Sequence, residues 1–266
     1  MPNDFGYAST NGISTYYEVH GTGPALVLVE GLGVATWLWE KQIEAFARHF
    51  TTIIYDLRGS GNSDKPNEDY SVSLFAQDLE ALLSELNVEK AHVLGVSLGG
   101  FIAQHFAANY PDRVDRLVLV STAPGGEHQI PMSEEIVEQL LVSTKGDQQL
   151  IREKMGLAFS NDFRATEEFE DLLNHRSKTK QPSASFLSQA KAGSAFDGWH
   201  DLKNIQAPTL IVAASGDLVV SSGNSILLNN QIENSELVIY PGLGHQFFVE
   251  APEPFNRDVI KFLSTG

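Results

Sequence analysis

The sequence predicts a doubly wound α/β fold, with a mostly parallel sheet and a helical cap inserted into it. Three observations predict it: short continuous apolar runs, helical patterns that alternate with them, and one long interval without such a run. Continuous apolar runs are typical of strands that are buried on both faces of a parallel sheet. The alternation of strand and helix favours right-handed crossovers, which cover both faces of that sheet with helices.

The strands are expected to start near the N-terminus. Residues 13–20 (ISTYYEVH) are rich in β-branched and aromatic side chains and end at a Gly-Thr-Gly turn, which is typical of an edge strand. The buried strands are expected at six further runs: 25–29, 51–55, 91–95, 116–120, 209–213 and 237–240. The helical patterns between them cover residues 37–49, 74–86, 98–109, 225–232 and 254–262.

The interval from about Gly125 to His200 breaks this alternation. It contains only helix-favouring segments, such as 134–142 and 167–175. Because so long an interval cannot be a loop inside a compact fold, we expect a helical cap there. The predicted organisation is therefore a core formed by residues 1–124 and 201–266, with a cap at 125–200.

Charge and composition exclude several classes of function. The net charge of −16, from 34 acidic and 18 basic residues, argues against a basic surface for nucleic acid or anionic membranes. The absence of cysteine excludes disulfides, thiolate metal sites and a cysteine nucleophile. No signal-like start and no apolar stretch of membrane-spanning length is present. We expect a soluble, cytoplasmic monomer or homodimer that acts on a small apolar molecule.

The most informative stretch is Gly95-Val96-Ser97-Leu98-Gly99, which joins a predicted strand to a predicted helix. A nucleophile on such a sharp turn has a strained backbone, so the residues two before and two after it must be small. The side chain then lies at the positive end of the helix, where a developing anion is favoured. This spacing predicts that Ser97 is a nucleophile.

A base and an acid are expected at the ends of two later strands. His245 follows the last strand in a Gly-Leu-Gly-His loop, and catalytic groups in open α/β sheets gather at the carboxyl ends of strands. Asp217 follows the strand at 209–213, where it could fix the imidazole tautomer. Asp197 and Asp201 are rivals, but no strand precedes them. The predicted triad is Ser97, Asp217 and His245.

A tetrahedral intermediate needs backbone donors for its oxygen. One is expected to be the amide of Leu98, the residue after the nucleophile. The other should come from the loop after the strand at 25–29, which reads Glu30-Gly31-Leu32-Gly33, with Leu32 as the donor. The glycines of this loop allow the backbone to come close to a ligand.

These motifs together resemble the α/β-hydrolase superfamily. The resemblance is carried by the triad residues, by the stretch 56–63 (DLRGSGNS), and by Gly244-His245 followed by Glu250-Ala-Pro252. Within the superfamily the chain resembles the small esterase and enol-lactonase-like group. It is also similar to a bacterial stress-signalling hydrolase and to its plant hormone-receptor relatives.

The chain departs from the superfamily at Glu30-Gly31, where relatives commonly have His-Gly. We interpret Glu30 as a brace that accepts hydrogen bonds from backbone amides, although a catalytic acid or base at this position is the alternative. Asp56 and Arg58 are interpreted as structural, because such pairs at a strand end usually brace neighbouring loops.

The expected activity is hydrolysis of a small carboxylic ester, thioester or lactone through an acyl-enzyme on Ser97, without a metal or organic cofactor. Carbon–carbon bond cleavage, acyl transfer, a cofactor-free perhydrolase activity and a ligand-binding signalling role with slow turnover remain alternatives. Five aromatic cap residues suggest an apolar acyl pocket, or else ordinary core packing: Phe159, Phe163, Phe186, Phe196 and Trp199.

Overall fold

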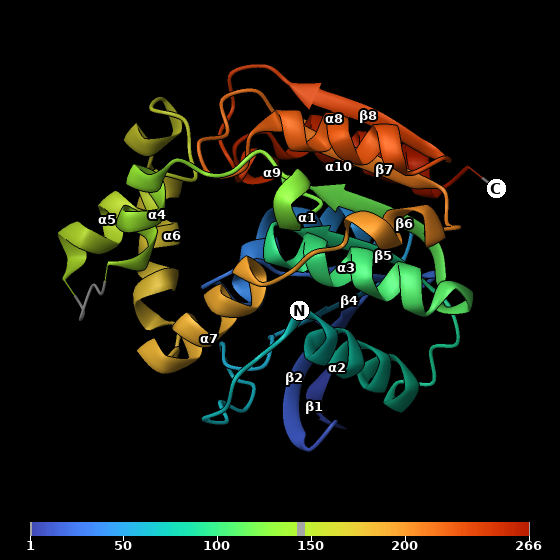
Figure 1. Cartoon of the computed structure of the whole chain (residues 1–266). Helices are drawn as coiled ribbons and strands as arrows, with labels where there is room; N and C mark the ends of the chain where they lie inside the picture. Colours follow the sequence, from blue (N-terminus) through green and yellow to red (C-terminus); the bar gives the residue numbers. More distant parts are fainter. Residues whose placement is uncertain (1, 143–146, 266) are drawn as a thin grey trace.

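The computed structural model describes residues 2–142 and 147–265 of the 266-residue chain. Its centre is one eight-stranded sheet of order β1-β2-β4-β3-β5-β6-β7-β8 (Figure 1). The first two pairings, β1 with β2 and β2 with β4, are antiparallel, and all the others are parallel. The strands are β1 (Asp4–Thr10), β2 (Ile13–His20), β3 (Ala25–Val29), β4 (Thr51–Tyr55), β5 (Ala91–Val96), β6 (Val114–Val120), β7 (Thr209–Ala214) and β8 (Ser235–Tyr240). The predicted mostly parallel sheet is confirmed.

The N-terminal edge of the sheet differs from the prediction. Strand β2 pairs with β1 on one side and with β4 on the other, so residues 13–20 are not an edge strand. The edge is β1, which the sequence did not indicate. Its two large side chains, Phe5 and Tyr7, are exposed, so β1 lacks the buried apolar run by which the central strands were recognised.

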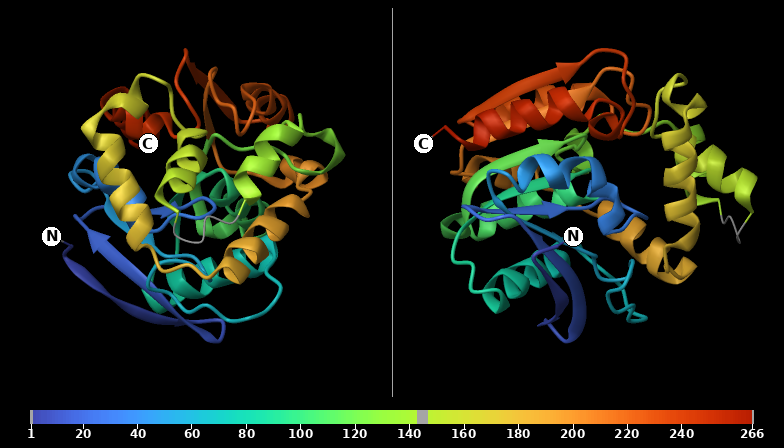
Figure 2. Two further views of the ribbon diagram at one scale, coloured as in Figure 1. Left: turned by 90° about the vertical axis from the view of Figure 1, so that its left-hand side faces the viewer. Right: turned by 180° about the vertical axis from the view of Figure 1, so that it is seen from behind.

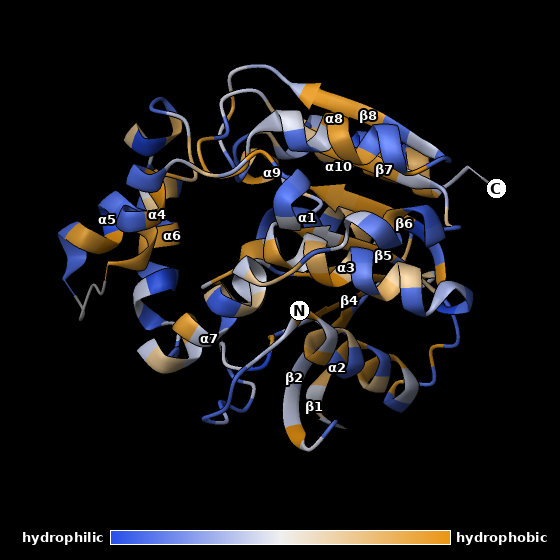
Figure 3. Cartoon of the chain, in the orientation of Figure 1, coloured by the Kyte–Doolittle hydropathy of each residue, from blue (hydrophilic) through white to orange (hydrophobic). Residues whose placement is uncertain are grey.

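Helices cover both faces of the sheet. On one face lie α2 (Val72–Glu85), α3 (Leu98–Asn109) and α8 (Ser222–Gln231), and on the other lie α1 (Glu40–Phe46), α9 (Phe247–Glu250) and α10 (Pro252–Leu263). Strand β3 shows the two layers directly. Val27 and Val29 belong to the first core, whereas Leu26 and Leu28 belong to the second. Figure 3 shows the hydrophobic strands between these layers.

The predicted cap region carries α4 (Glu134–Leu141), α5 (Gln148–Gly156), α6 (Glu167–Lys178) and α7 (Ser183–Ser194). These helices lie at the end of the sheet toward which β6 and β8 point (Figures 1 and 2). The two ends of the region meet, because Gly125 forms a bridge with Asp197 and the Gly126 amide donates to the Phe196 carbonyl at 2.9 Å. The cap therefore lies over the carboxyl ends of the parallel strands, where the predicted site residues are.

Within residues 2–142 and 147–265, the helices are all too short or too polar to cross a bilayer.

Candidate active site

Ser97 lies in a strained turn between β5 and α3. Its backbone has φ 55° and ψ −116°, which few non-glycine residues adopt. A β-carbon added at Gly95 would lie 2.2 Å from the Gly99 carbonyl oxygen, and one added at Gly99 would lie 2.1 Å from the Val29 carbonyl oxygen. No side chain fits at either position. The close packing of this turn therefore requires the Gly-x-Ser-x-Gly spacing.

Asp217 and His245 form a buried pair at the ends of two neighbouring strands. His245 Nδ1 lies 2.7 Å from Asp217 Oδ2, and the two side chains are 7% and 1% exposed. The other carboxylate oxygen, Asp217 Oδ1, accepts from the amides of Val219 and Val220, each at 2.8 Å. This arrangement fixes the ring and leaves Nε2 as the nitrogen available for chemistry.

Backbone contacts place this pair beside Ser97. The Ser97 amide donates to the Val120 carbonyl at 3.0 Å, and the next residue, Ser121, donates its hydroxyl to the His245 carbonyl at 2.9 Å. In the described part of the chain, the Ser97 hydroxyl makes no hydrogen bond to His245. Catalytic hydrogen bonds of this kind are often long without substrate, and they tighten when it binds.

The predicted oxyanion loop lies against the nucleophile. A β-carbon added at Gly31 would lie 3.4 Å from Ser97 Cβ, so the backbone before Leu32 packs directly on the serine. Leu98 is the first residue of α3, where a backbone amide has no partner within the helix. Leu98, one predicted donor, therefore follows Ser97 in the chain. The loop that contains Leu32, the other predicted donor, packs against Ser97 in space.

Glu30 is completely buried at the start of this loop. Its Oε1 accepts from the Leu57 amide at 3.0 Å, and its Oε2 has no partner among the described residues. Burial, reinforced by the nearby Asp56 carboxylate, raises the pKa of Glu30 well above its ordinary value, and the Leu57 hydrogen bond only partly opposes this. The shift favours the protonated, neutral form of the Glu30 carboxyl.

Asp56 braces the neighbouring loops. Its two oxygens accept from the amides of Thr36 at 2.8 Å and Asn62 at 2.7 Å. These contacts agree with the structural role expected for Asp56.

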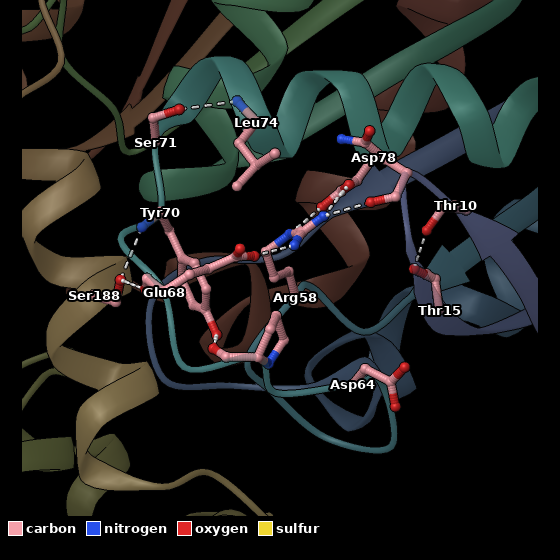
Figure 4. Close-up of polar contacts among 12 residues, drawn as sticks. Thr10, Thr15, Arg58, Asp64, Glu68, Tyr70, Ser71, Leu74, Asp78 and Ser188 are labelled. Atoms are coloured by element: carbon pink, nitrogen blue, oxygen red, sulfur yellow. Dashed lines mark hydrogen bonds and ion pairs between the residues drawn. The ribbon is translucent and has the colours of Figure 1, made fainter.

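Arg58 holds the loop after β4 to a helix. Its guanidinium donates to both oxygens of Asp78 in α2, at 2.7 and 2.8 Å, and also to Glu68 (Figure 4). The same figure shows Ser188 of α7 bonded to this loop, at the Tyr70 amide and the Glu68 carbonyl. Arg58 is therefore structural too, as expected.

The rival acids do not pair with His245. Asp197 Oδ1 accepts from the Trp199 amide at 3.2 Å, and its backbone forms the bridge to Gly125. Asp201 lies in a 3-10 helix, Trp199–Asn204, at the exit from the cap. Of the three candidate carboxylates, Asp217 is the one that contacts the imidazole.

Glu250 connects the histidine loop to the cap, which the sequence did not reveal. Its Oε1 accepts from the amides of Gly244 at 2.9 Å and Ser160 at 3.2 Å, and its Oε2 accepts from the Ser160 hydroxyl. The Gln246 amide also donates to the Ala158 carbonyl at 2.8 Å. The signal available in the sequence was the spacing along the chain between His245 and Glu250, but that spacing does not indicate a partner in the cap.

The cap aromatics mostly pack on other rings. Phe159 contacts the ring of Phe163 at 5.0 Å between centroids, Phe196 contacts that of Phe101 at 4.9 Å, and Trp199 stacks on His128 at 4.3 Å. Phe186 is different, because its Cε2 lies 3.0 Å from a β-carbon added at Gly33, in the oxyanion loop. Phe186 therefore contacts the loop that carries Gly33, and its part in an acyl pocket stays a prediction.

No group of three or more His, Asp or Glu side chains within residues 2–142 and 147–265 is arranged to hold a metal ion.

Comparisons with known proteins agree with this geometry. Residues 24–252 match the family model described as "alpha/beta hydrolase fold". The protein "Putative carbamate hydrolase RutD" from Caulobacter sp. (strain K31) is 32% identical over 94% of this chain and 95% of its own length. The chain therefore belongs to the α/β-hydrolase fold family, as the sequence motifs predicted.

Two solved structures are similar over nearly the whole chain. The enol-lactonase from Burkholderia xenovorans LB400 has a TM-score of 0.86 and 25% identity, covering 97% of this chain and 100% of its own. The meta-cleavage product hydrolase from Pseudomonas fluorescens IP01 has a TM-score of 0.86 and 26% identity, covering 97% of both chains. The enol-lactonase agrees with the predicted resemblance to that group, and all three comparisons support hydrolase activity.

Proposed function

We propose that this protein is a serine hydrolase that cleaves a small carboxylic ester, thioester or lactone through an acyl-enzyme on Ser97. The observation that carries the proposal is the strained Ser97 turn beside the buried Asp217–His245 pair. The structural similarity to an enol-lactonase gives further support for a lactone or ester bond.

In the proposed reaction, Ser97 Oγ attacks the carbonyl carbon and His245 Nε2 takes its proton. Asp217 keeps the ring in the required tautomer and stabilises the imidazolium that forms. The amides of Leu32 and Leu98 donate to the oxyanion of the tetrahedral intermediate. His245 then gives its proton to the leaving oxygen or sulfur, and a water molecule releases the acyl group from Ser97 by the same steps.

Covalent labelling tests the nucleophile. A fluorophosphonate should add to Ser97 alone, and Ser97→Ala should abolish both labelling and p-nitrophenyl ester turnover while the circular dichroism spectrum is unchanged. Ser9→Ala is the control, because Ser9 is exposed on the edge strand β1 and should behave as wild type. An adduct on another residue, or full turnover in Ser97→Ala, would refute the proposal.

Cleavage of a carbon–carbon bond next to a ketone is the second candidate. It is favoured by the similarity to the meta-cleavage product hydrolase. A panel of esters, lactones, carbamates and vinylogous diketones, each tested with wild type and Ser97→Ala, would separate the chemistries by kcat/KM. A signalling protein, in contrast, would consume its ligand about once per binding event.

A further inference from the structure

Arg176, in α6, is the one arginine whose guanidinium has neither a hydrogen bond nor a carboxylate partner among the described residues. Each of the other arginines donates to an oxygen atom: Arg48, Arg58, Arg113, Arg116, Arg152, Arg164 and Arg257. Burial lowers the pKa of Arg176, and no neighbouring acid opposes that shift. The Arg176 side chain is only partly exposed and lacks a counter-charge among the described residues, so the site is suited to an anion.

This guanidinium lies beside the oxyanion loop. A β-carbon added at Gly33 would lie 3.7 Å from Arg176 Nη2 and 3.0 Å from Phe186 Cε2. Gly33 directly follows Leu32 and is two residues from Gly31, which packs on Ser97. Two residues span at most about 7 Å of chain. A group bound at Arg176 is therefore within reach of a small molecule attached to Ser97.

A second cation lies on the same aromatic ring. Lys154 Nζ, from α5, is 4.1 Å from the centroid of Phe186. Burial, together with the charge of Arg176, lowers the pKa of Lys154 to about 8. Its Nζ donates to the Val142 carbonyl at 3.3 Å, and no carboxylate pairs with it within the described residues. Residues 143–146 read Ser-Thr-Lys-Gly and bring no carboxylate either.

The arrangement is unusual for this chain, whose net charge is −16. Two cations lie close together here without an acidic partner among the described residues, although acidic residues are in excess over the whole chain. Elsewhere in the same pair of helices, Arg152 of α5 takes Glu170 of α6 as its partner. Arg176 and Lys154 have no such acidic partner within the described residues, and they lie where the predicted cap region meets the loop at Gly33.

We infer that Arg176 and Lys154 bind a carboxylate carried by the substrate, so that the ester or lactone cleaved at Ser97 is an anionic one. The inference rests on the proposed function and names its substrate class. The planar guanidinium can donate two parallel hydrogen bonds to a carboxylate, and the ammonium adds a second charge. The Phe186 ring then contacts the apolar part between the carboxylate and the scissile carbonyl.

Kinetics with matched substrates test the inference. We would measure kcat/KM for p-nitrophenyl hemiesters of succinate, glutarate and adipate, and for their methyl diesters, which lack the charge. Wild type should prefer at least one hemiester about tenfold. Arg176→Met should lower kcat/KM for that hemiester by about 10- to 100-fold, the range expected for a charge-assisted hydrogen bond, and alter the diester by less than about threefold.

Lys154→Met should give a smaller loss in the same direction, about tenfold. Lys178→Met is the control, because Lys178 is an exposed cation on the same helix α6 and should leave the preference unchanged. An equal response of hemiesters and diesters to Arg176→Met would overturn the inference.

A binding measurement separates failure of this inference from failure of the proposed chemistry. Calorimetry of Ser97→Ala with monomethyl adipate and dimethyl adipate requires no turnover. Tighter binding of the monoanion, lost in the double variant Ser97→Ala/Arg176→Met, supports the anion site even if neither ester is hydrolysed. Equal binding of both compounds, unchanged in the double variant, overturns it even if both esters are hydrolysed.

Discussion

At the scale of single residues, Glu30 shows how burial decides between two roles. An ionised carboxylate about 5 Å from the developing oxyanion would oppose it by roughly 3 kcal/mol at an effective dielectric of 20. Full burial raises the pKa of Glu30 and so favours its neutral form, which carries no such cost, while its Oε1 accepts a hydrogen bond from the Leu57 amide. The loop-brace interpretation is consistent with these contacts, and a neutral Glu30 does not oppose the oxyanion.

Glu30→Gln should keep kcat within about tenfold of wild type, because glutamine matches the shape of a neutral carboxyl and can still accept from the Leu57 amide. Glu30→Ala should retain the mechanism but lose about 1–3 kcal/mol of stability, since it leaves that buried amide without an acceptor. Steady-state kinetics and urea unfolding measure the two effects. A well-folded Glu30→Gln that loses more than about a hundredfold in kcat would make Glu30 part of the chemistry.

At the scale of elements, the turn between β5 and α3 is held by backbone packing against the neighbouring loop. Gly99 approaches the carbonyl oxygens of Val29 and Glu30, so the first turn of α3 and the oxyanion loop fix each other's position. Glu250 does the same between the histidine loop and the cap, by way of Gly244 and Ser160. The geometry of the candidate site thus depends on contacts between elements rather than on any single element.

Gly99→Ala should lower the free energy of unfolding by about 1–3 kcal/mol, because its methyl group would overlap the Val29 carbonyl oxygen. It should also reduce kcat about a hundredfold, because the methyl group would push the oxyanion loop away from Gly99 and displace its backbone donors from the reacting group. Gly6→Ala is the control: its methyl group would meet only the Tyr17 side chain, at an ordinary 3.5 Å. Stability and activity both equal to wild type in Gly99→Ala would contradict the packing argument.

At the scale of the whole molecule, the buried carboxyl of Glu30 couples stability to pH. In the unfolded chain the Glu30 carboxyl has a pKa of about 4.3 and releases its proton above that pH. In the folded protein the raised pKa of Glu30 keeps the proton bound to a higher pH. The folded state then binds more protons than the unfolded state, so stability from this group is present below that pKa. It is lost as pH rises from there toward the raised pKa of the folded state.

The free energy of unfolding of wild type relative to Glu30→Gln should therefore fall as pH rises above about 4, by at most about 1.4 kcal/mol per pH unit, until the raised folded-state pKa of Glu30 is passed. Subtracting the variant removes from the comparison the titrating groups that do not interact with Glu30. Glu89→Gln serves as the control for the substitution itself, because Glu89 is exposed. A difference for Glu30→Gln that is constant over this range would show that Glu30 is ionised in the folded protein.

The sequence by itself determined the parallel sheet, the strained serine turn and the order Ser97, Asp217, His245. These features are local: apolar runs mark buried strands, and glycine spacing marks a turn that excludes side chains. Each predicted site residue follows a strand, and parallel strands deliver their carboxyl ends to the same edge of a sheet. For that reason the positions could be predicted without coordinates.

Only the tertiary structure decided the pairing of β2, the partners of Glu250, and the place of Arg176 and Lys154 beside Gly33. These contacts join segments far apart in the sequence, and nothing in the spacing of either segment indicates the other. An arginine in a polar cap helix has the pattern of a solvent-exposed residue until the fold shows which acids surround it. Desolvation and pairing are properties of the neighbours that folding brings together, so the charge of the site could be assigned only from the three-dimensional arrangement.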